Sequence, residues 1–237
     1  MKKLLLAATT AAMMTGAGIA SAVEIAGNVA LTSDYKFRGL SQTDEGAAIQ
    51  GGFDLGFDNG FYVGTWGSNV DFANSLELDY YGGWAGDLSD SVSVDVGYLY
   101  YDYPSSDTED DYQEVYASVS FADFTVGAAY SDDYYLETGK FYYVYADYGF
   151  ELGDGWGVSL HVGLNEFAES SSDNDASFTA FLTDDADSYV DYSVGVSKDY
   201  AGVTWDLSYV GTDLDEEEYG DTDYGDGAVI FTISKSL

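Results

Sequence analysis

Apolar and polar residues alternate along most of the chain from about residue 23 onward. In VSVDVGYLY (residues 92–100), valine and tyrosine take every second position, and serine, aspartate and glycine take most of the others. The pattern recurs in GVSLHVGLN (157–165), VTWDLSY (203–209) and VIFTISKSL (229–237). A period of two residues is typical of a β-strand, and we find no amphipathic helix after residue 22.

Twelve such segments predict twelve strands. Their approximate spans are 25–38, 47–57, 61–70, 75–85, 91–103, 112–121, 124–133, 140–150, 156–165, 188–198, 202–211 and 227–237. Most are about ten residues long, the length that a tilted strand needs to cross a bilayer. An even strand number is also usual for single-chain bacterial outer-membrane barrels.

The connections between these segments alternate in length. The second, fourth, sixth, eighth and tenth are short (DNG, GDLSD, AD, ELGDG and DYAG), whereas the others tend to be longer and more acidic. Short periplasmic turns and longer outer loops produce this alternation in a membrane barrel, and a soluble β-sandwich, the alternative, does not. We therefore predict an all-β fold: a single transmembrane antiparallel up-and-down β-barrel of about 12 strands.

The first 22 residues have the features of a secretory signal peptide. A basic start (MKK) precedes an apolar run and the small-residue cleavage site Ala20–Ser21–Ala22. We expect residues 1–22 to be cleaved and residues 23–237 to form the barrel domain. The expected location is the outer membrane of a Gram-negative bacterium, where lipid and lipopolysaccharide surround the barrel.

Composition excludes several other classes of protein. The chain has 7 Lys and Arg against 43 Asp and Glu, a formal charge of −36, so nucleic acid is not an expected partner because phosphate binding needs clustered cations. Acidic chains with few aromatic residues are often disordered, but this one has 23 Tyr, 13 Phe and 4 Trp. It has no cysteine, so disulfides cannot hold the fold.

Three stretches near the start resemble a known family. TSDYKFRGLSQT (32–43), AIQGGFDLGF (48–57) and GFYVGTWGSNVDF (60–72) are similar to the opening of the TorF family, a group of porin-like envelope proteins of proteobacteria. The similarity extends to the closing ISKSL (233–237). The resemblance implies an outer-membrane barrel and gives no substrate.

Strand parity predicts which side chains enter the lumen. If LTSDYKFRGLSQ (31–42) is part of the first strand, Leu31, Tyr35 and Phe37 face lipid, and Thr32, Asp34, Lys36 and Arg38 face inward. The predicted pore-lining or selectivity residues are Lys36, Arg38, Asp34, Asp54, Glu77, Asp79, Asp95 and Glu114, with Asp147, Asp191 and Asp206 also inward. Opposed charges at a constriction would select ions; the alternative is a structural ladder of ion pairs that fills the bore.

The lumenal aromatic residues also have two interpretations. Lumenal parity includes Tyr62, Trp66, Tyr81, Tyr101, Tyr116, Tyr143 and Tyr145. They could form a track on which sugars stack, but we favour rings that pack the bore with their hydroxyl groups bonded to carboxylates.

Acidic residues gather in the last long connection, without any cation between residues 212 and 227. We expect at most weak, loosely bound Ca²⁺ or Mg²⁺ at Asp215, Glu216, Glu217 and Glu218, because oxygen ligands suit these ions. The alternative is a solvated acidic rim. Either would concentrate cations at the mouth of a pore. We expect no other cofactor.

Ser159 and His161 raise the question of hydrolysis, because a serine beside a histidine can be a nucleophile and its base. Both have lumenal parity, away from phospholipid, and we predict no enzymatic activity. The predicted function is a narrow, cation-preferring porin for passive diffusion of small polar solutes or ions. The alternative is a non-conducting barrel whose acidic loops bind a partner, divalent cations or a surface. The sequence does not indicate an oligomeric state.

Overall fold

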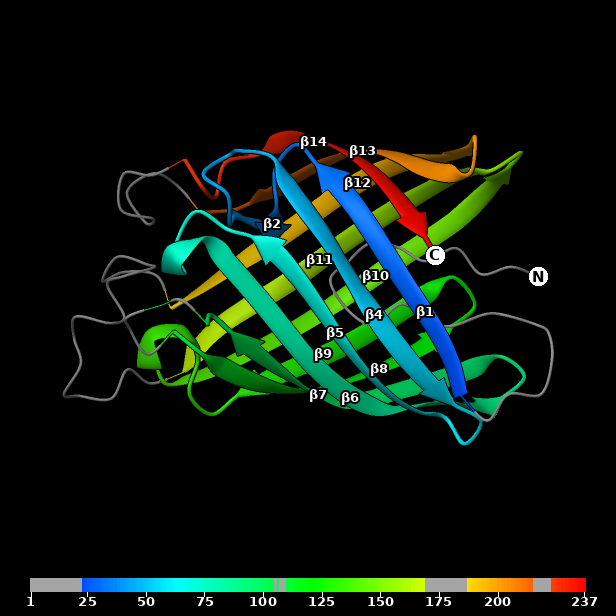
Figure 1. The fold of residues 1–237 in the computed structure, drawn as a ribbon, viewed down its shortest axis with the longest axis horizontal. Helices are drawn as coiled ribbons and strands as arrows, with labels where there is room; N and C mark the ends of the chain where they lie inside the picture. The colour runs from blue at the N-terminus through cyan, green and yellow to red at the C-terminus, as the bar shows by residue number, and fades with distance from the viewer. Residues whose placement is uncertain (1–22, 105, 107–109, 169–186, 215–222) are drawn as a thin grey trace.

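Twelve antiparallel strands close into a barrel in the computed structural model of the chain (Figure 1). The structure describes residues 23–104, 106, 110–168, 187–214 and 223–237. The barrel strands are β1 (Val23–Thr32), β4 (Ala48–Phe57), β5 (Phe61–Asn69), β6 (Leu76–Ser89), β7 (Val92–Asp102), β8 (Tyr112–Phe121), β9 (Phe124–Ser131), β10 (Lys140–Gly153), β11 (Trp156–Ala168), β12 (Ser188–Tyr200), β13 (Val203–Thr212) and β14 (Ala228–Ser236). The predicted fold and strand number are confirmed.

Each strand pairs with its neighbours in sequence, and β1 closes the ring by pairing with β14 as well as with β4. This closing seam joins residues 28–32 of β1 to residues 232–236 of β14, whereas β1 pairs with β4 along its whole length. Closure joins the first and last strands along this seam, and an open sheet edge does not occur in lipid.

The polarity of the barrel is inverted relative to a soluble protein. Large apolar side chains are exposed on the outside, for example Ile25 (72%) and Phe53 (63%). Polar side chains of the opposite parity are buried within, for example Glu77 (2%) and Asn165 (0%). Period-two alternation has this result in a closed sheet, because successive side chains point to opposite faces. Among the described residues, no helix is long and apolar enough to cross a membrane.

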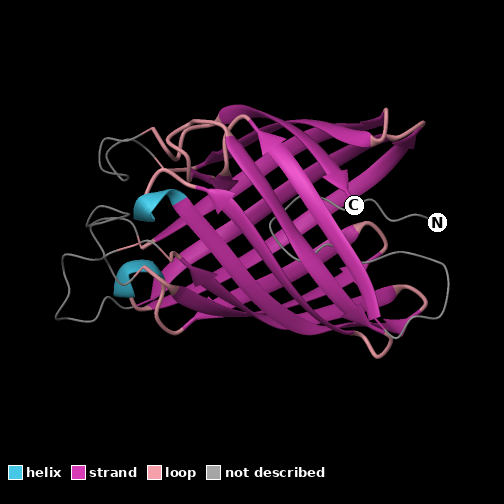
Figure 2. Ribbon diagram, viewed as in Figure 1, coloured by secondary structure: helices cyan, strands magenta, loops and turns pink. Residues whose placement is uncertain are grey.

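The two ends of the barrel differ, as Figure 2 shows. Tight turns join β4 to β5, β6 to β7, β8 to β9, β10 to β11 and β12 to β13, and they lie at the end where β1 begins and β14 ends. The longer connections lie at the opposite end, with the short 3-10 helices η1 (Ala73–Ser75) and η2 (Tyr135–Glu137). The predicted alternation of connection lengths therefore places the short turns at one end of the barrel and the long connections at the other.

The predicted first strand, 25–38, was too long. β1 ends at Thr32, and residues 33–47 form a separate segment that contains two short paired strands, β2 (Lys36–Phe37) and β3 (Leu40–Ser41). We call residues 33–47 the inner hairpin.

Candidate functional site

The inner hairpin folds into the barrel instead of extending β1. Lys36 pairs with Ser41 and Phe37 with Leu40, and the turn between them has positive φ at Arg38 (48°) and Gly39 (82°). Two consecutive positive φ values are typical of the tight turn that suits the twist of a β-hairpin. The chain therefore reverses at Gly39.

This path corrects the predicted orientation of two aromatic side chains. Tyr35 is 4% exposed and packs edge-on against lumenal Trp66, with ring centroids 5.5 Å apart. Phe37 packs edge-on against lumenal Tyr101 at 5.8 Å. Both lie inside the barrel and not on its lipid face; of the three residues assigned there, only Leu31 (55% exposed) faces outward. The prediction failed because the alternation of β1 continues into residues that have already left the strand.

Arg38 crosses the lumen from the tip of the inner hairpin to the wall. Its guanidinium donates two hydrogen bonds of 2.8 Å to Glu114 on β8, and it lies over the rings of Phe37, Phe141 and Tyr143 at 4.3–4.8 Å. Bidentate geometry and aromatic stacking are what arginine provides and lysine does not. Arg38 is therefore lumenal as predicted, but it projects from the hairpin and its charge is paired.

Lys36 points instead to the connection after β13. Its ammonium donates to the backbone carbonyls of Tyr224 (3.0 Å) and Asp226 (2.7 Å). Burial lowers the pKa of Lys36 below its ordinary value, while the nearby carboxylates of Asp34, Glu45 and Asp226 oppose that shift. The predicted alternation of Lys36 and Arg38 along one strand is therefore absent, and each fastens the hairpin to a different part of the barrel.

Asp34 holds the inner hairpin together from within. One carboxylate oxygen accepts hydrogen bonds from Ser41 (2.7 Å) and Thr43 (3.0 Å). The hydroxyl of Thr43 also lies 3.1 Å from the backbone N–H of Tyr35, from which it accepts. Asp34 is thus part of the hairpin and not of the strand wall on which it was predicted.

The remaining predicted carboxylates lie on the lumenal wall. Glu77 accepts hydrogen bonds from Tyr35 and Tyr103, each 2.8 Å. Asp54 accepts from Tyr81 at 2.5 Å, and Asp95 accepts from Tyr62 at 2.6 Å. Asp79 is 8% exposed beside Glu77 on β6. These four carboxylates lie on the lumenal face of the barrel wall; their role in selectivity stays a prediction.

Several lumenal tyrosine rings lie flat over glycines of the neighbouring strand. Tyr81 pairs with Gly64 and Tyr116 pairs with Gly97. A Cβ atom added at either glycine would lie 2.4 Å from the tyrosine ring. Only glycine leaves this space, so the ring rests on the wall and its hydroxyl reaches a lumenal partner. This supports the packing interpretation of the lumenal aromatic residues.

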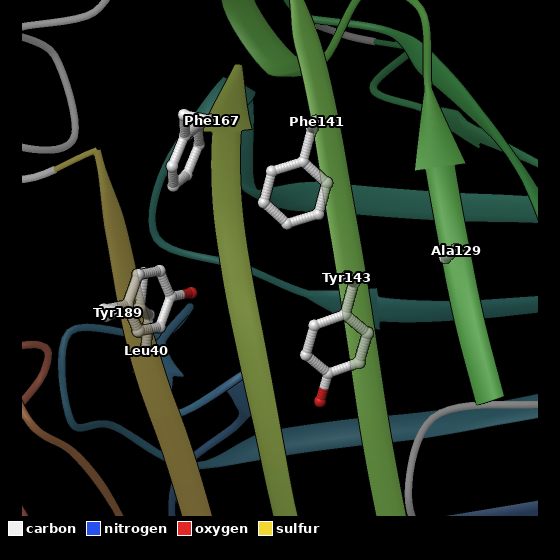
Figure 3. Packing of buried hydrophobic residues seen from close by; sticks show 6 residues of the cluster. All are labelled: Leu40, Ala129, Phe141, Tyr143, Phe167 and Tyr189. Atoms are coloured by element: carbon white, nitrogen blue, oxygen red, sulfur yellow. The ribbon is translucent and has the colours of Figure 1, made fainter. Parts of the chain in front are cut away.

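Aromatic side chains also fill the loop end of the lumen (Figure 3). Phe141 and Tyr143 project from β10, Phe167 from β11 and Tyr189 from β12, and Leu40 of the inner hairpin joins this cluster. Phe141 is 1% exposed. The hairpin and the wall thus share one apolar cluster, which narrows the bore at this end.

His161 is held between two carboxylates on the same side of the barrel. Its Nδ1 lies 2.6 Å from Asp147 and its Nε2 lies 2.8 Å from Asp191. A carboxylate only accepts, so both ring nitrogens donate and the ring carries a positive charge. Neither nitrogen is left to act as a base for Ser159, and the hypothesis of a catalytic serine–histidine pair receives no support from this geometry.

The acidic connection lies partly outside the described residues. The predicted divalent-ion ligands there are Asp215, Glu216, Glu217 and Glu218, and all four lie outside. The predicted signal peptide, residues 1–22, also lies outside the described residues. Among the residues that the structure describes, no group of three or more His, Asp or Glu side chains is arranged to hold a metal ion.

A closed antiparallel barrel that is apolar outside and polar within is the architecture of a membrane-spanning, porin-like barrel. The chain belongs to the Gcw_chp family, described as bacterial proteins of unknown function, whose model matches residues 16–237. That family model does not carry the TorF name, so the resemblance to TorF stays a prediction.

Solved structures of porins share this fold. The NanC porin is 11% identical with a TM-score of 0.55, over 89% of this chain and 98% of that one. The KdgM porin is 9% identical with a TM-score of 0.55, over 90% and 98%. A KdgM porin in complex with disordered oligogalacturonate is 7% identical with a TM-score of 0.54, over 90% and 97%. At these identities the likeness shows the fold alone. No curated protein matches the chain.

Proposed function

We propose that this protein is an outer-membrane channel that lets small cations and small polar solutes diffuse passively. The observation that carries the proposal is the inverted polarity of a closed barrel: an apolar exterior suited to hydrocarbon and a lumen lined with carboxylates and hydroxyls. The barrel sits in the outer membrane of a Gram-negative bacterium, surrounded by lipid and lipopolysaccharide. The shared fold of the NanC and KdgM porins supports this class of function.

Lumenal charge supports a preference for cations. Arg38 is bonded to Glu114, and His161 is bonded to Asp147 and Asp191. Further carboxylates lie inside the barrel, namely Asp34, Asp54, Glu77, Asp79, Asp95 and Asp206. A cavity lined by one sign of charge raises the local concentration of the opposite ion. A polyanion such as the oligogalacturonate bound to KdgM would be repelled here.

The inner hairpin supports a narrow channel. It occupies the loop end of the bore, where its residues pack against lumenal side chains of β5, β7 and β12. Inward-folded loops restrict the size of solutes that pass. The single-channel conductance should therefore be low for a barrel of this strand number.

Planar-bilayer recording tests the proposal directly. Purified protein in a gradient of potassium chloride should give small channel events whose reversal potential favours potassium, and raising the salt concentration should weaken that preference because ions screen the lumenal charge. Channels that favour chloride, or a membrane that stays silent, would reject it.

The inner hairpin also favours a second candidate, a non-conducting barrel whose acidic loops bind a partner, divalent cations or a surface. In that case the wild-type protein would be silent, and replacing residues 36–41 by a short glycine–serine linker would open it. A true pore would instead conduct before and after that replacement, with larger events afterwards.

A further inference from the structure

We propose that cations follow one wall of the lumen, formed by β4, β5, β6 and β7, along a row of four carboxylates: Glu77, Asp79, Asp54 and Asp95. The proposal rests on the proposed channel function and specifies where in the lumen the transported class of ion, small monovalent cations, makes contact. The argument begins from how differently the two sides of the lumen are neutralised.

Carboxylates on the β8–β12 side have cationic partners. Glu114 on β8 forms two hydrogen bonds with Arg38, and Asp147 on β10 and Asp191 on β12 flank His161. The fields of Arg38 and Glu114 largely cancel, and the positive ring of His161 offsets half of the charge of Asp147 and Asp191, so these groups attract a third ion less than carboxylates without a cationic partner. This side of the lumen therefore offers a passing cation less stabilisation than the opposite wall.

The partners on the β4–β7 side are phenols. Tyr35 and Tyr103 donate to Glu77, Tyr81 donates to Asp54 and Tyr62 donates to Asp95, at distances of 2.5–2.8 Å. A phenol supplies one neutral hydrogen bond and brings no positive charge to the carboxylate. Within the described part of the chain, no lysine, arginine or histidine forms an ion pair with these four.

Two oxygen atoms of this row have no donor at all among the described residues. They are Oδ2 of Asp54 and Oδ1 of Asp79, on side chains that are 3% and 8% exposed. A buried carboxylate oxygen ordinarily has a hydrogen-bond donor or a cation beside it, because losing water without such a partner is costly. A cation supplies both the coordination and the charge that the phenols do not.

The register places the four carboxylates in order along the barrel. Glu77 and Asp79 occupy successive lumenal positions of β6, starting from the loop end, and Tyr81 is the next. Tyr81 crosses Gly64, its partner on β5, and so reaches Asp54 on β4. Asp95 pairs with Ala85, two lumenal positions farther along β6. Gly64 therefore joins carboxylates from separate strands into one row.

A row of single carboxylates is better suited to passing a cation along than to holding it in place. Conduction requires sites that bind strongly enough for an ion to enter and weakly enough for it to leave. The described residues contain no group of three or more His, Asp or Glu arranged to trap a metal ion. Each position offers one carboxylate, three of them with a bonded phenol oxygen beside it, and an ion can pass from one to the next.

Reversal potentials of three isosteric variants test the path. Asp54→Asn and Asp79→Asn remove one ionisable carboxyl group each from the row, and Asp147→Asn removes one from the opposite, paired side. We expect the first two to lower the permeability ratio of potassium to chloride several-fold and the third to lower it clearly less. Equal shifts in all three would mean that total lumenal charge alone sets the preference, and would overturn the proposal.

Crystallography with thallium(I), an analogue of potassium, gives a measurement that does not depend on conduction. Crystals of the full mature barrel grown in thallium acetate should show anomalous density beside Asp54 or Asp79, and Asp79→Asn should lose the density at its own position. A silent wild-type bilayer would reject the channel function by itself. Thallium sites confined to other parts of the lumen, or absent from it, would reject the path.

Discussion

Arg38 and Glu114, 76 residues apart in the chain, form two parallel hydrogen bonds of 2.8 Å inside the barrel. The pair joins the tip of the inner hairpin to β8, and both side chains are almost completely buried. Removing one partner of such a pair leaves an uncompensated buried charge, whereas replacing both with apolar residues often costs little.

Arg38→Met should therefore lower the free energy of unfolding by roughly 3 kcal/mol, and the double variant Arg38→Met/Glu114→Met should recover most of that loss. Urea unfolding in phospholipid vesicles, followed by tryptophan fluorescence, measures both. Equal stability of the single and double variants would show that the pair does not hold the hairpin.

The flat ring of Tyr116 over Gly97 gives a second prediction. Gly97→Ala places a methyl group against the ring, and overpacking of this kind costs about 1–3 kcal/mol. The same substitution in a Tyr116→Ala background should cost much less, because the ring is gone. A double-mutant cycle on unfolding free energies checks this; the same cost in both backgrounds would contradict it.

Neighbouring residues on β8 test the inverted polarity. Ala117 faces outward and Ser118 faces the lumen. Ala117→Arg should lower stability in vesicles by about 2–4 kcal/mol, the cost of arginine at a lipid-facing position near the bilayer centre. Ser118→Arg should lower stability less, since lumenal carboxylates can form an ion pair with the arginine. A larger loss of stability for Ser118→Arg than for Ala117→Arg would contradict the assignment of the lipid-facing side.

His161 and Ser159 should respond very differently to substitution. His161→Gln leaves Asp147 and Asp191 without the charge they share, so we expect a loss of stability and a higher preference for cations in bilayer recordings. Ser159→Ala should change neither, because both nitrogens of His161 are already bonded to carboxylates. An esterase activity of the purified barrel that Ser159→Ala abolishes would contradict this.

Much of the barrel follows from local patterns. Alternation places Val96, Leu160 and Phe231 outside and Asp95, His161 and Thr232 inside, and the structure agrees. Short connections with small or acidic residues mark the tight turns, such as Ala122–Asp123 between β8 and β9. These features depend only on residues that are close together in the chain, so they can be predicted from the sequence.

The inner hairpin could not be recognised in the same way. TSDYKFRGLS keeps a period of two, so it looks like more of the preceding strand. Arg38–Gly39 is a weaker turn signal than Asn–Gly, although Gly39 does adopt the positive φ that the turn requires. The decisive contacts, Arg38 to Glu114 and Tyr35 to Glu77, join residues far apart in the chain. A predicted strand register could have given one clue to the site: it would have shown the pairs of glycine and tyrosine across neighbouring strands, on which the lumenal rings rest.

The position of the inner hairpin constrains the order of assembly. It connects β1 to β4 and lies within the ring, and the ring is completed where β1 meets β14. Once that seam has formed, the aromatic cluster around Leu40 and the bonds of Arg38 can be reached only from the loop end. The segment should therefore be tucked in while the first and last strands are still apart, so that insertion and internal packing occur together.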